Sequence, residues 1–493
     1  MIALISLPIL LPLFGAALAI GLGRWRVAQR LVSIITLTTV TATSVALLIR
    51  VDHDGAAAVH AGGWRAPIGI TLVADRLAAI MLLVACLMLL AVLVFAIGQP
   101  GAERQHVGFH PVYLILTAGI AMAFLTGDLF NLFVAFEVTL MASYVLITLG
   151  GRPDQIRSGM TYVVISLIAS TIFLLSLAFV YAATGSVNLA DLHTKIAALP
   201  DGLRSGLAVL LIVVFGIKAA LFPLFFWLPD SYPTAPTPVT AVFAGLLTKV
   251  GVYAIIRTQT VLFPPDTQPG HLLLIVAGLT MVVGVFGAIT QNDIKRILSF
   301  HIISQIGYMI MGLGLFSLAG LAGAVLYIIH HIVVKTTLFL VAGLVEQRAG
   351  TGQLASLSGL ARAEPVLAVL FLVPALSLAG IPPFSGFVAK LALVDAGIGG
   401  GEYLIVAVSL AVSLLTLFSM TKIWSNAFWG PPASHPAGPP RRAGLALMTG
   451  STAALVALSI AIALWAGPLY ALSERTAADL INPTSYIETV LGR

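Results

Sequence analysis

The chain has 493 residues, of which 59% are hydrophobic and only 9% are charged, and its formal net charge is +6. A soluble domain carries about 25% charged residues, so this composition excludes a soluble globular protein and predicts an integral membrane protein that has no role in binding nucleic acid. The single cysteine, Cys86, excludes an intramolecular disulfide, a thiolate zinc site and a cysteine-bound iron–sulfur cluster. The sequence contains neither a Walker motif nor a dinucleotide fingerprint, so we expect no cofactor and no bound metal.

Apolar runs of about twenty residues follow one another along the chain, and each is long enough to cross a bilayer as a helix. We expect an all-α membrane protein with about fourteen spans. The first run, from residue 1 to about residue 22, is interpreted as a retained span rather than a cleaved signal peptide. We expect N-terminal spans at 1–100, two repeats at 108–258 and 270–428, and a last span with a tail at 445–493.

Basic residues in the predicted loops set the expected orientation. Arg24, Arg26 and Arg30 precede the second span, and Arg441 and Arg442 precede the last. By the positive-inside rule these loops are cytoplasmic, which places both termini outside. The remaining arginines are assigned to loops as well, so the sequence predicts that no arginine is buried in a span.

Two segments interrupt the helical pattern. The first follows Lys218 and is rich in proline, and the second, AGIPPFSGFVAK, ends at Lys390. Proline removes a backbone donor and clashes with the preceding turn, so both helices should be broken. Broken helices at corresponding places in two halves of a transporter indicate an ion path. The prolines and glycines concerned are Pro223, Pro229, Pro233, Pro236, Pro238, Gly380, Pro382, Pro383 and Gly386.

Five ionisable residues lie inside apolar runs, namely Glu137, Lys218, Lys249, Lys335 and Lys390. A charge at the centre of a bilayer costs at least about 2.5–3.5 kcal/mol, and such residues usually mark an ion or proton pathway. Burial disfavours the charged form of a lysine, which makes proton exchange easier. The alternative is a structural role: Glu137 as partner of a buried lysine, Lys218 and Lys249 as links between helices, and Lys390 as a residue that snorkels to an interface.

Three histidines extend this set. His331 and Lys335 are four residues apart and so share a helical face, with His330 beside them. This group could relay protons, whereas metal binding is disfavoured because adjacent histidines point in different directions and no carboxylate joins them. His301 is either a polar link or a satisfied interior histidine. If the second half repeats the first, Glu137 has no carboxylate counterpart there, because that helix offers only groups such as His301 and Gln305.

Three further segments have simpler interpretations. Asp128 is expected to cap the helix that carries Glu137. Residues 188–199 resemble an amphipathic surface helix, with a solvated connector as the favoured alternative. Residues 425–444 are proline-rich and predict a flexible cytoplasmic turn.

Together these residues resemble a known family. A glutamate in the fifth span, lysines in the seventh and eighth, and a lysine at a broken twelfth are similar to the antiporter-like subunits of respiratory complex I, membrane-bound hydrogenases and the Mrp cation/proton antiporters. The resemblance covers about residues 75–430, and it is greatest to the Mrp branch in FLTGDLFNLFVAFEVTLMASYVLI, FPLFFWLPDSYPTAPTPVTA and SFHIISQIGYM. By this resemblance we expect neither the lateral helix of the largest complex I subunit nor the extension of the longest Mrp subunit.

The resemblance implies two inverted five-helix repeats with flanking helices and broken helices seven and twelve. It implies that Glu137 pairs with Lys218, that Lys249 is a central link and that Lys390 is the exchange site on the far side. The expected function is proton conduction in a multisubunit Na⁺/H⁺ antiporter of a bacterial plasma membrane, together with other membrane subunits and the lipid bilayer. The alternatives are a proton-pumping subunit of a redox-driven complex, a transporter of an organic solute and a structural scaffold.

Overall fold

The protein was analysed as a computed structural model, which describes residues 2–99, 108–431 and 442–492. Helices make up nearly all of this part of the chain. The two strands, β1 (Ala57–His60) and β2 (Thr71–Ala74), pair antiparallel with Ala57 opposite Ala74. The predicted all-α membrane fold is therefore confirmed.

The bounds of the helices follow the apolar runs. In chain order the helices are α1 (Ile2–Gly21), α2 (Arg26–Asp54), α3 (Arg76–Gly98), α4 (Phe109–Leu125), α5 (Leu129–Ile147), α6 (Pro153–Thr184), α7 (Leu189–Ala197), α8 (Asp201–Ala219), α9 (Trp227–Ser231), α10 (Thr237–Val242), α11 (Thr248–Val261), α12 (Gly270–Thr290), α13 (Ile294–Gly314), α14 (Leu318–Ala349), α15 (Leu360–Ala363), α16 (Pro365–Ala379), α17 (Ser385–Gly399), α18 (Tyr403–Ile423), α19 (Arg442–Leu464), α20 (Ala466–Ile481) and α21 (Thr484–Leu491).

Twelve helical segments of the described chain are long and apolar enough to span a membrane. Two further apolar helices, α4 and α16, are shorter, with 17 and 15 residues. The expected count of about fourteen spans is therefore not confirmed by length and composition. The second of these short helices is one half of a predicted broken span.

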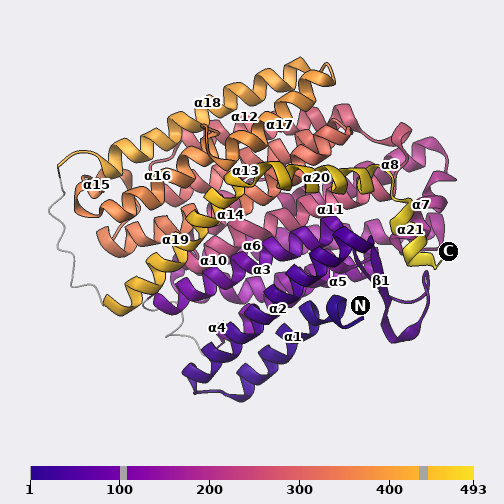
Figure 1. Ribbon diagram of the computed structural model, residues 1–493, viewed down its shortest axis with the longest axis horizontal. Helices are drawn as coiled ribbons and strands as arrows, with labels where there is room; N and C mark the ends of the chain where they lie inside the picture. The colour runs from indigo at the N-terminus through magenta and orange to yellow at the C-terminus, as the bar shows by residue number, and fades with distance from the viewer. Residues whose placement is uncertain (1, 100–107, 432–441, 493) are drawn as a thin grey trace.

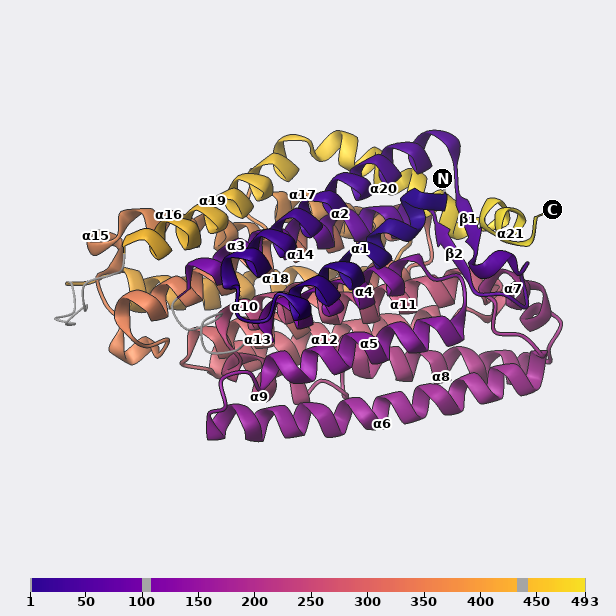
Figure 2. The ribbon, with the colours of Figure 1, turned by 90° about the horizontal axis from the view of Figure 1, so that it is seen from below.

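The helices pack side by side into a bundle whose centre is formed by α14 and by the span of α10 and α11 (Figure 1). The most apolar window of each of these two spans is 100% buried, whereas that of α6 is only 39% buried. Figure 2 shows α6 along one outer edge of the bundle, and both termini toward the end that carries β1, α7 and α21. A polar residue on the central spans is thus enclosed by protein, not by lipid.

The second half of the bundle repeats the spacing of the first. The same number of residues separates the start of α5 from that of α13, the start of α6 from that of α14, and the end of α6 from that of α14. The helices α6 and α14 each have 32 residues. This common spacing assigns each residue of α5 and α6 a counterpart in α13 and α14.

Backbone contacts repeat in the same register. Asp128 caps α5 by accepting a hydrogen bond from the Asn131 amide, and Asp293 caps α13 in the same way through Arg296. The predicted cap at Asp128 is confirmed. The next amide in each helix bonds to the chain that follows the long helix, and the pairs are Leu129 N to Val187 O (2.9 Å) and Ile294 N to Gly352 O (3.0 Å).

Both predicted helix breaks are present, and they have the same backbone pattern. The first helix, α8, ends at Ala219 and Ala220 turns into the left-handed region (φ 61°), while α16 ends at Ala379 and Gly380 turns likewise (φ 86°). The amide after each turn reaches back to a carbonyl five residues earlier, from Leu221 to Gly216 (2.9 Å) and from Ile381 to Leu376 (3.1 Å). Each break therefore ends a helix inside the bundle, with its last turn closed by a backbone hydrogen bond.

Two surface segments differ from expectation. The segment 188–199 forms a real helix, α7, which Asn188 caps and which buries Leu192 and Ile196, so the solvated-connector alternative is wrong. The predicted loop 425–444 begins as a helical turn, because η6 (Trp424–Phe428) continues α18 with Trp424 and Phe428 stacked on each other. Its residues 432–441, Arg441 included, lie outside the described part of the chain.

Candidate functional site

The first group of ionisable residues joins α5, α6 and α8. The Lys218 ammonium, on the last turn of α8, donates to the carbonyl of Ser166 (3.2 Å) and to the hydroxyl of Ser170 (3.3 Å). The Ser170 hydroxyl in turn donates to a carboxylate oxygen of Glu137. Glu137 and Lys218 are thus brought together as predicted, but with one hydroxyl between them.

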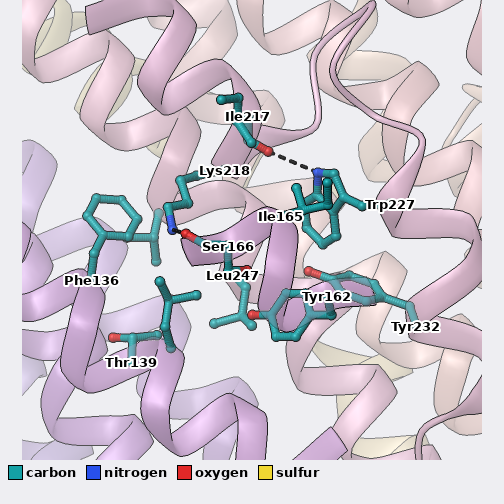
Figure 3. A pocket seen from close by; sticks show the side chains of 12 residues that line it. Phe136, Thr139, Tyr162, Ile165, Ser166, Ile217, Lys218, Trp227, Tyr232 and Leu247 are labelled. Carbon is teal, nitrogen blue, oxygen red and sulfur yellow. Dashed lines mark hydrogen bonds between the residues drawn. The ribbon is translucent and has the colours of Figure 1, made fainter. Parts of the chain in front are cut away.

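A small cavity of about 30 Å³ adjoins Lys218, and a space of this size holds about one water molecule. Figure 3 shows Lys218 and Ser166 on one side of the cavity and Tyr162, Trp227 and Tyr232 on another. Most of the wall is apolar or aromatic, and Lys218 Nζ lies 6.0 Å from the centre of the Phe136 ring. The ammonium is therefore buried, with 8% of the residue exposed.

The end of α8, at Lys218, packs closely against α11, the helix that carries Lys249. A Cβ atom at Gly251 on α11 would lie 2.7 Å from the backbone nitrogen of Ala219 and 3.0 Å from the carbonyl carbon of Lys218. Only glycine permits this approach of α11 to the end of α8. Lys249 lies two residues before Gly251 on the same helix, on a different face of α11.

Lys249 follows a π-helical segment, η3 (Phe243–Leu247), between α10 and α11. Its ammonium donates to the carbonyl of Ala244 (2.5 Å), and the residue is completely buried. Such π-helical turns are rare and are frequently found at functional sites. Lys249 is thus enclosed at the centre of the bundle with a neutral oxygen as its partner.

His331 and Lys335 lie on the buried face of α14 that is turned toward η3 and α11. Lys249 is close enough for its charge to interact with both of them. Neither the Lys335 ammonium nor either ring nitrogen of His331 has a hydrogen-bond partner among the described residues. His330 faces elsewhere, toward α17, where its Nδ1 lies 2.9 Å from the Ser385 hydroxyl.

Lys390 lies at the second break, where its ammonium donates to the Ala379 carbonyl (3.1 Å) and to the Ser413 hydroxyl (2.8 Å). It also lies 4.9 Å from the centre of the Tyr308 ring. The residue is 7% exposed, so the alternative of a lysine that snorkels to an interface is wrong.

Aromatic and amide groups connect the second break with α14. The rings of Tyr308 and Tyr327 stack 5.2 Å apart, and Tyr327 stacks on His331 at 6.4 Å. The Tyr327 hydroxyl donates to the Gln305 side chain. His301 is fully buried against the Ser419 hydroxyl on α18, which makes it a polar link between two helices.

The structure therefore places the predicted series from Glu137 to Lys390 inside the bundle, where all of its members are buried except Glu137, which is partly exposed. In the repeat register Glu137 corresponds to Ile302, so its counterpart is apolar, with His301 and Gln305 nearby on α13. No group of three or more histidine, cysteine, aspartate or glutamate side chains that could hold a metal is found in the described ranges. The chemistry that these side chains can perform is the transfer of protons among nitrogen and oxygen atoms.

Several residues of this series were not predicted. They are Ser166, Ser170, Ser413, Tyr308 and Tyr327, each of which contacts a predicted residue. The spacing of Ser166 and Ser170, four residues apart on an apolar helix, was an available signal for two hydroxyls on one face. The tyrosines carried no such signal, because a buried tyrosine is common in any helix core.

A buried ion pair corrects the prediction that no arginine is buried in a span. Arg257 on α11 binds Asp75 through two hydrogen bonds (2.5 and 2.7 Å), and the two side chains are 3% and 7% exposed. Asp75 also caps α3 by accepting from the Ala78 amide. The paired geometry offsets the cost of burying the two charges. Assigning arginines to predicted loops does not detect such a pair.

Outside the spans, burial raises the pKa of Asp128 at the start of α5, although the amides of Asn131 and Phe130 oppose this by lowering it. The carboxyl thus caps the helix that carries Glu137 from an enclosed position.

Comparison with known proteins identifies a common architecture. The family described as NADH:quinone oxidoreductase/Mrp antiporter, TM, matches residues 126–416. The chain is 46% identical over 490 residues to the D subunit of the Na⁺/H⁺ antiporter of Alkalihalophilus pseudofirmus, covering 99% of each protein. It superposes with a TM-score of 0.93 and 36% identity on a chain of the Mrp complex from a Dietzia species, covering 100% of each chain. A chain of an archaeal membrane-bound sulfane sulfur reductase gives a TM-score of 0.88 at 25% identity, covering 99% of each chain.

Proposed function

Because the chain belongs to the NADH:quinone oxidoreductase/Mrp antiporter family, we propose that it is the proton-conducting D-type subunit of a multisubunit Na⁺/H⁺ antiporter. The observation that carries this proposal is the chain of hydrogen bonds from Glu137 through Ser170 to the buried Lys218, placed at a helix break. A carboxylate and a lysine that share one hydroxyl can exchange a proton without contact with bulk water.

The order of the residues suggests the course of the proton. It enters at Glu137 and Lys218, passes to Lys249 on the neighbouring helix α11, and continues to His331 and Lys335 on α14. It then reaches Lys390 at the second break by way of the region between Tyr327 and Tyr308, with His301 and His330 as flanking groups. A change in the charge of any one of these groups alters the proton affinity of its neighbours, and this is how the series can couple proton movement to another ion.

The redox-driven alternative is less well supported. The relative with an antiporter name is 46% identical to the chain, whereas the chain of the sulfur reductase is 25% identical. Copurification distinguishes the two functions. Small hydrophobic subunits without cofactors indicate the antiporter, and flavin or iron–sulfur subunits indicate the redox complex.

The proposed setting is a bacterial plasma membrane with both termini on the outer face. The two termini lie toward the same end of the bundle (Figure 2), which agrees with this assignment. We retain 1–100, 108–258, 270–428 and 445–493 as the proposed units. The matching breaks and caps support the boundaries of the two repeats.

The test replaces Lys218 or Glu137 by alanine in the complete set of subunits and measures Na⁺/H⁺ antiport in everted membrane vesicles. Loss of at least about tenfold in rate is expected, the scale of a removed acid–base group. Lys195 is the matched control, because it lies on the surface helix α7 and pairs there with Asp191, outside the series. Wild-type antiport by an assembled complex that carries Lys218→Ala would contradict the proposal.

A further inference from the structure

One hydroxyl group separates the carboxylate and the ammonium of the first group of the site. Ser170 Oγ accepts a hydrogen bond from Lys218 Nζ and donates one to Glu137. The described residues include no direct ion pair between Glu137 and Lys218. Ser170 is 7% exposed and Lys218 is 8% exposed, so the hydroxyl and the ammonium are enclosed, whereas Glu137 is partly exposed.

In the second half of the bundle, the position that corresponds to Ser170 is occupied by an ionisable residue instead of a serine. The spacing that relates α6 to α14 places Ser166 opposite His331 and Ser170 opposite Lys335. The second half therefore has two ionisable groups at the positions where the first half has two hydroxyls. A serine hydroxyl gives and accepts a proton without a lasting change of charge, whereas a lysine at the same position would add a cation beside Lys218.

We propose that Ser170 is the proton relay between Lys218 and Glu137. The inference deepens the proposed function, on which it rests, by assigning the atom through which the first transfer runs. In the step toward Glu137, the Oγ–H bond of Ser170 breaks and an O–H bond forms on the carboxylate. At the same time one N–H bond of the Lys218 ammonium breaks and its proton replaces the one that Oγ has lost.

The products of this step are a neutral amine, a neutral carboxyl and an unchanged serine, so charge and atoms balance. The reverse step restores the charged pair. The hydroxyl also keeps the two charges from forming a direct ion pair, which would hold both of them in the charged state. The Ser170 oxygen thus both relays the proton and keeps the two charged groups apart.

The experiment compares Ser170→Ala, Ser170→Thr and Ser170→Val in the complete complex, with antiport measured in everted vesicles and the amount of assembled complex measured in parallel. Threonine and valine have the same shape and differ in the hydroxyl. The matched control is Ser176→Ala, because Ser176 is a buried serine of the same helix whose hydroxyl bonds to the Ile172 carbonyl of its own helix.

We expect at least about a tenfold loss of antiport rate for Ser170→Ala and Ser170→Val, and rates within about twofold of wild type for Ser170→Thr and Ser176→Ala. A wild-type rate for Ser170→Ala, or equal losses for the threonine and valine variants, would overturn the relay. If Ser170→Ala does not assemble, Ser170→Cys takes its place, since it keeps the volume and donates only weakly.

The parallel measurement on Lys218→Ala separates this inference from the function itself. If Lys218→Ala abolishes antiport while Ser170→Ala does not, the relay is wrong and the proposed function stands. If Lys218→Ala transports normally, both are wrong.

Discussion

At the scale of the residue, three lysines of the series are held by neutral oxygen atoms instead of carboxylates. Lys218 contacts a carbonyl and a hydroxyl, Lys249 contacts one carbonyl, and Lys390 contacts a carbonyl and a hydroxyl. A direct carboxylate partner would fix a lysine in its charged form, as the paired geometry fixes Arg257 against Asp75. The same protein thus contains a buried charge pair and a set of buried lysines whose partners are neutral.

A substitution at Lys390 tests whether antiport requires this side chain to change its charge. The variant Lys390→Arg keeps the positive charge, but a guanidinium does not release its proton in proteins. We expect at least about a tenfold loss of antiport, measured in vesicles that contain equal amounts of assembled complex.

A matched control for this variant is Lys422→Arg, because Lys422 bonds to the Ile289 and Gln291 carbonyls near the end of α18 and lies outside the series. Wild-type transport by Lys390→Arg would mean that a fixed charge at the second break is sufficient.

The sequence predicted the ionisable residues of the site but not their partners. Glu137 and the buried lysines were identifiable because a charge in an apolar run is costly. The role of Ser170 depends on three helices that meet only in the folded chain. Arg257 was misplaced for the same reason, since its partner Asp75 lies 182 residues away.

At the scale of the element, the two breaks and the π-helical segment place the lysines at depth. Prolines and glycines predicted both breaks correctly, because these residues act on the local backbone. The η3 segment lacks proline and was not predicted, since its geometry depends on how α10 and α11 pack against α14. The close approach at Gly251 is a second tertiary feature of this kind.

A substitution at Gly251 tests whether the close packing of α11 against α8 is needed. In Gly251→Ala the new methyl group would meet the backbone of α8 at 2.7 Å, so α11 must move away from Lys218. We expect the free energy of unfolding of the complex to fall by about 1–3 kcal/mol, which is typical of overpacking. We also expect slower antiport.

Gly206→Ala is the corresponding control, because a Cβ atom at this position on α8 meets nothing within 4 Å. Equal stability and transport of the two alanine variants would show that the contact between α8 and α11 is not tight.

At the scale of the whole molecule, the repeat produces two similar halves with different chemistry. Both halves have the same caps, long helices and breaks. The first half has a carboxylate and two serines at its site, whereas the corresponding positions of the second half hold Ile302, His331 and Lys335. In the proposed path, a proton that crosses the bundle passes from Glu137 and Lys218 by way of Lys249 to groups of the second half that have no carboxylate beside them.

Lys249 tests this account most directly, because its ammonium bonds to the Ala244 carbonyl and contributes no ion pair within the described part of the chain. Replacement of a buried charge by an apolar side chain of similar length is often neutral or stabilising. For Lys249→Met in the complete complex we predict normal assembly, an unchanged or higher melting temperature, and loss of Na⁺/H⁺ antiport in everted vesicles. Antiport at the wild-type rate by the assembled Lys249→Met complex would contradict a single proton path through the buried lysines.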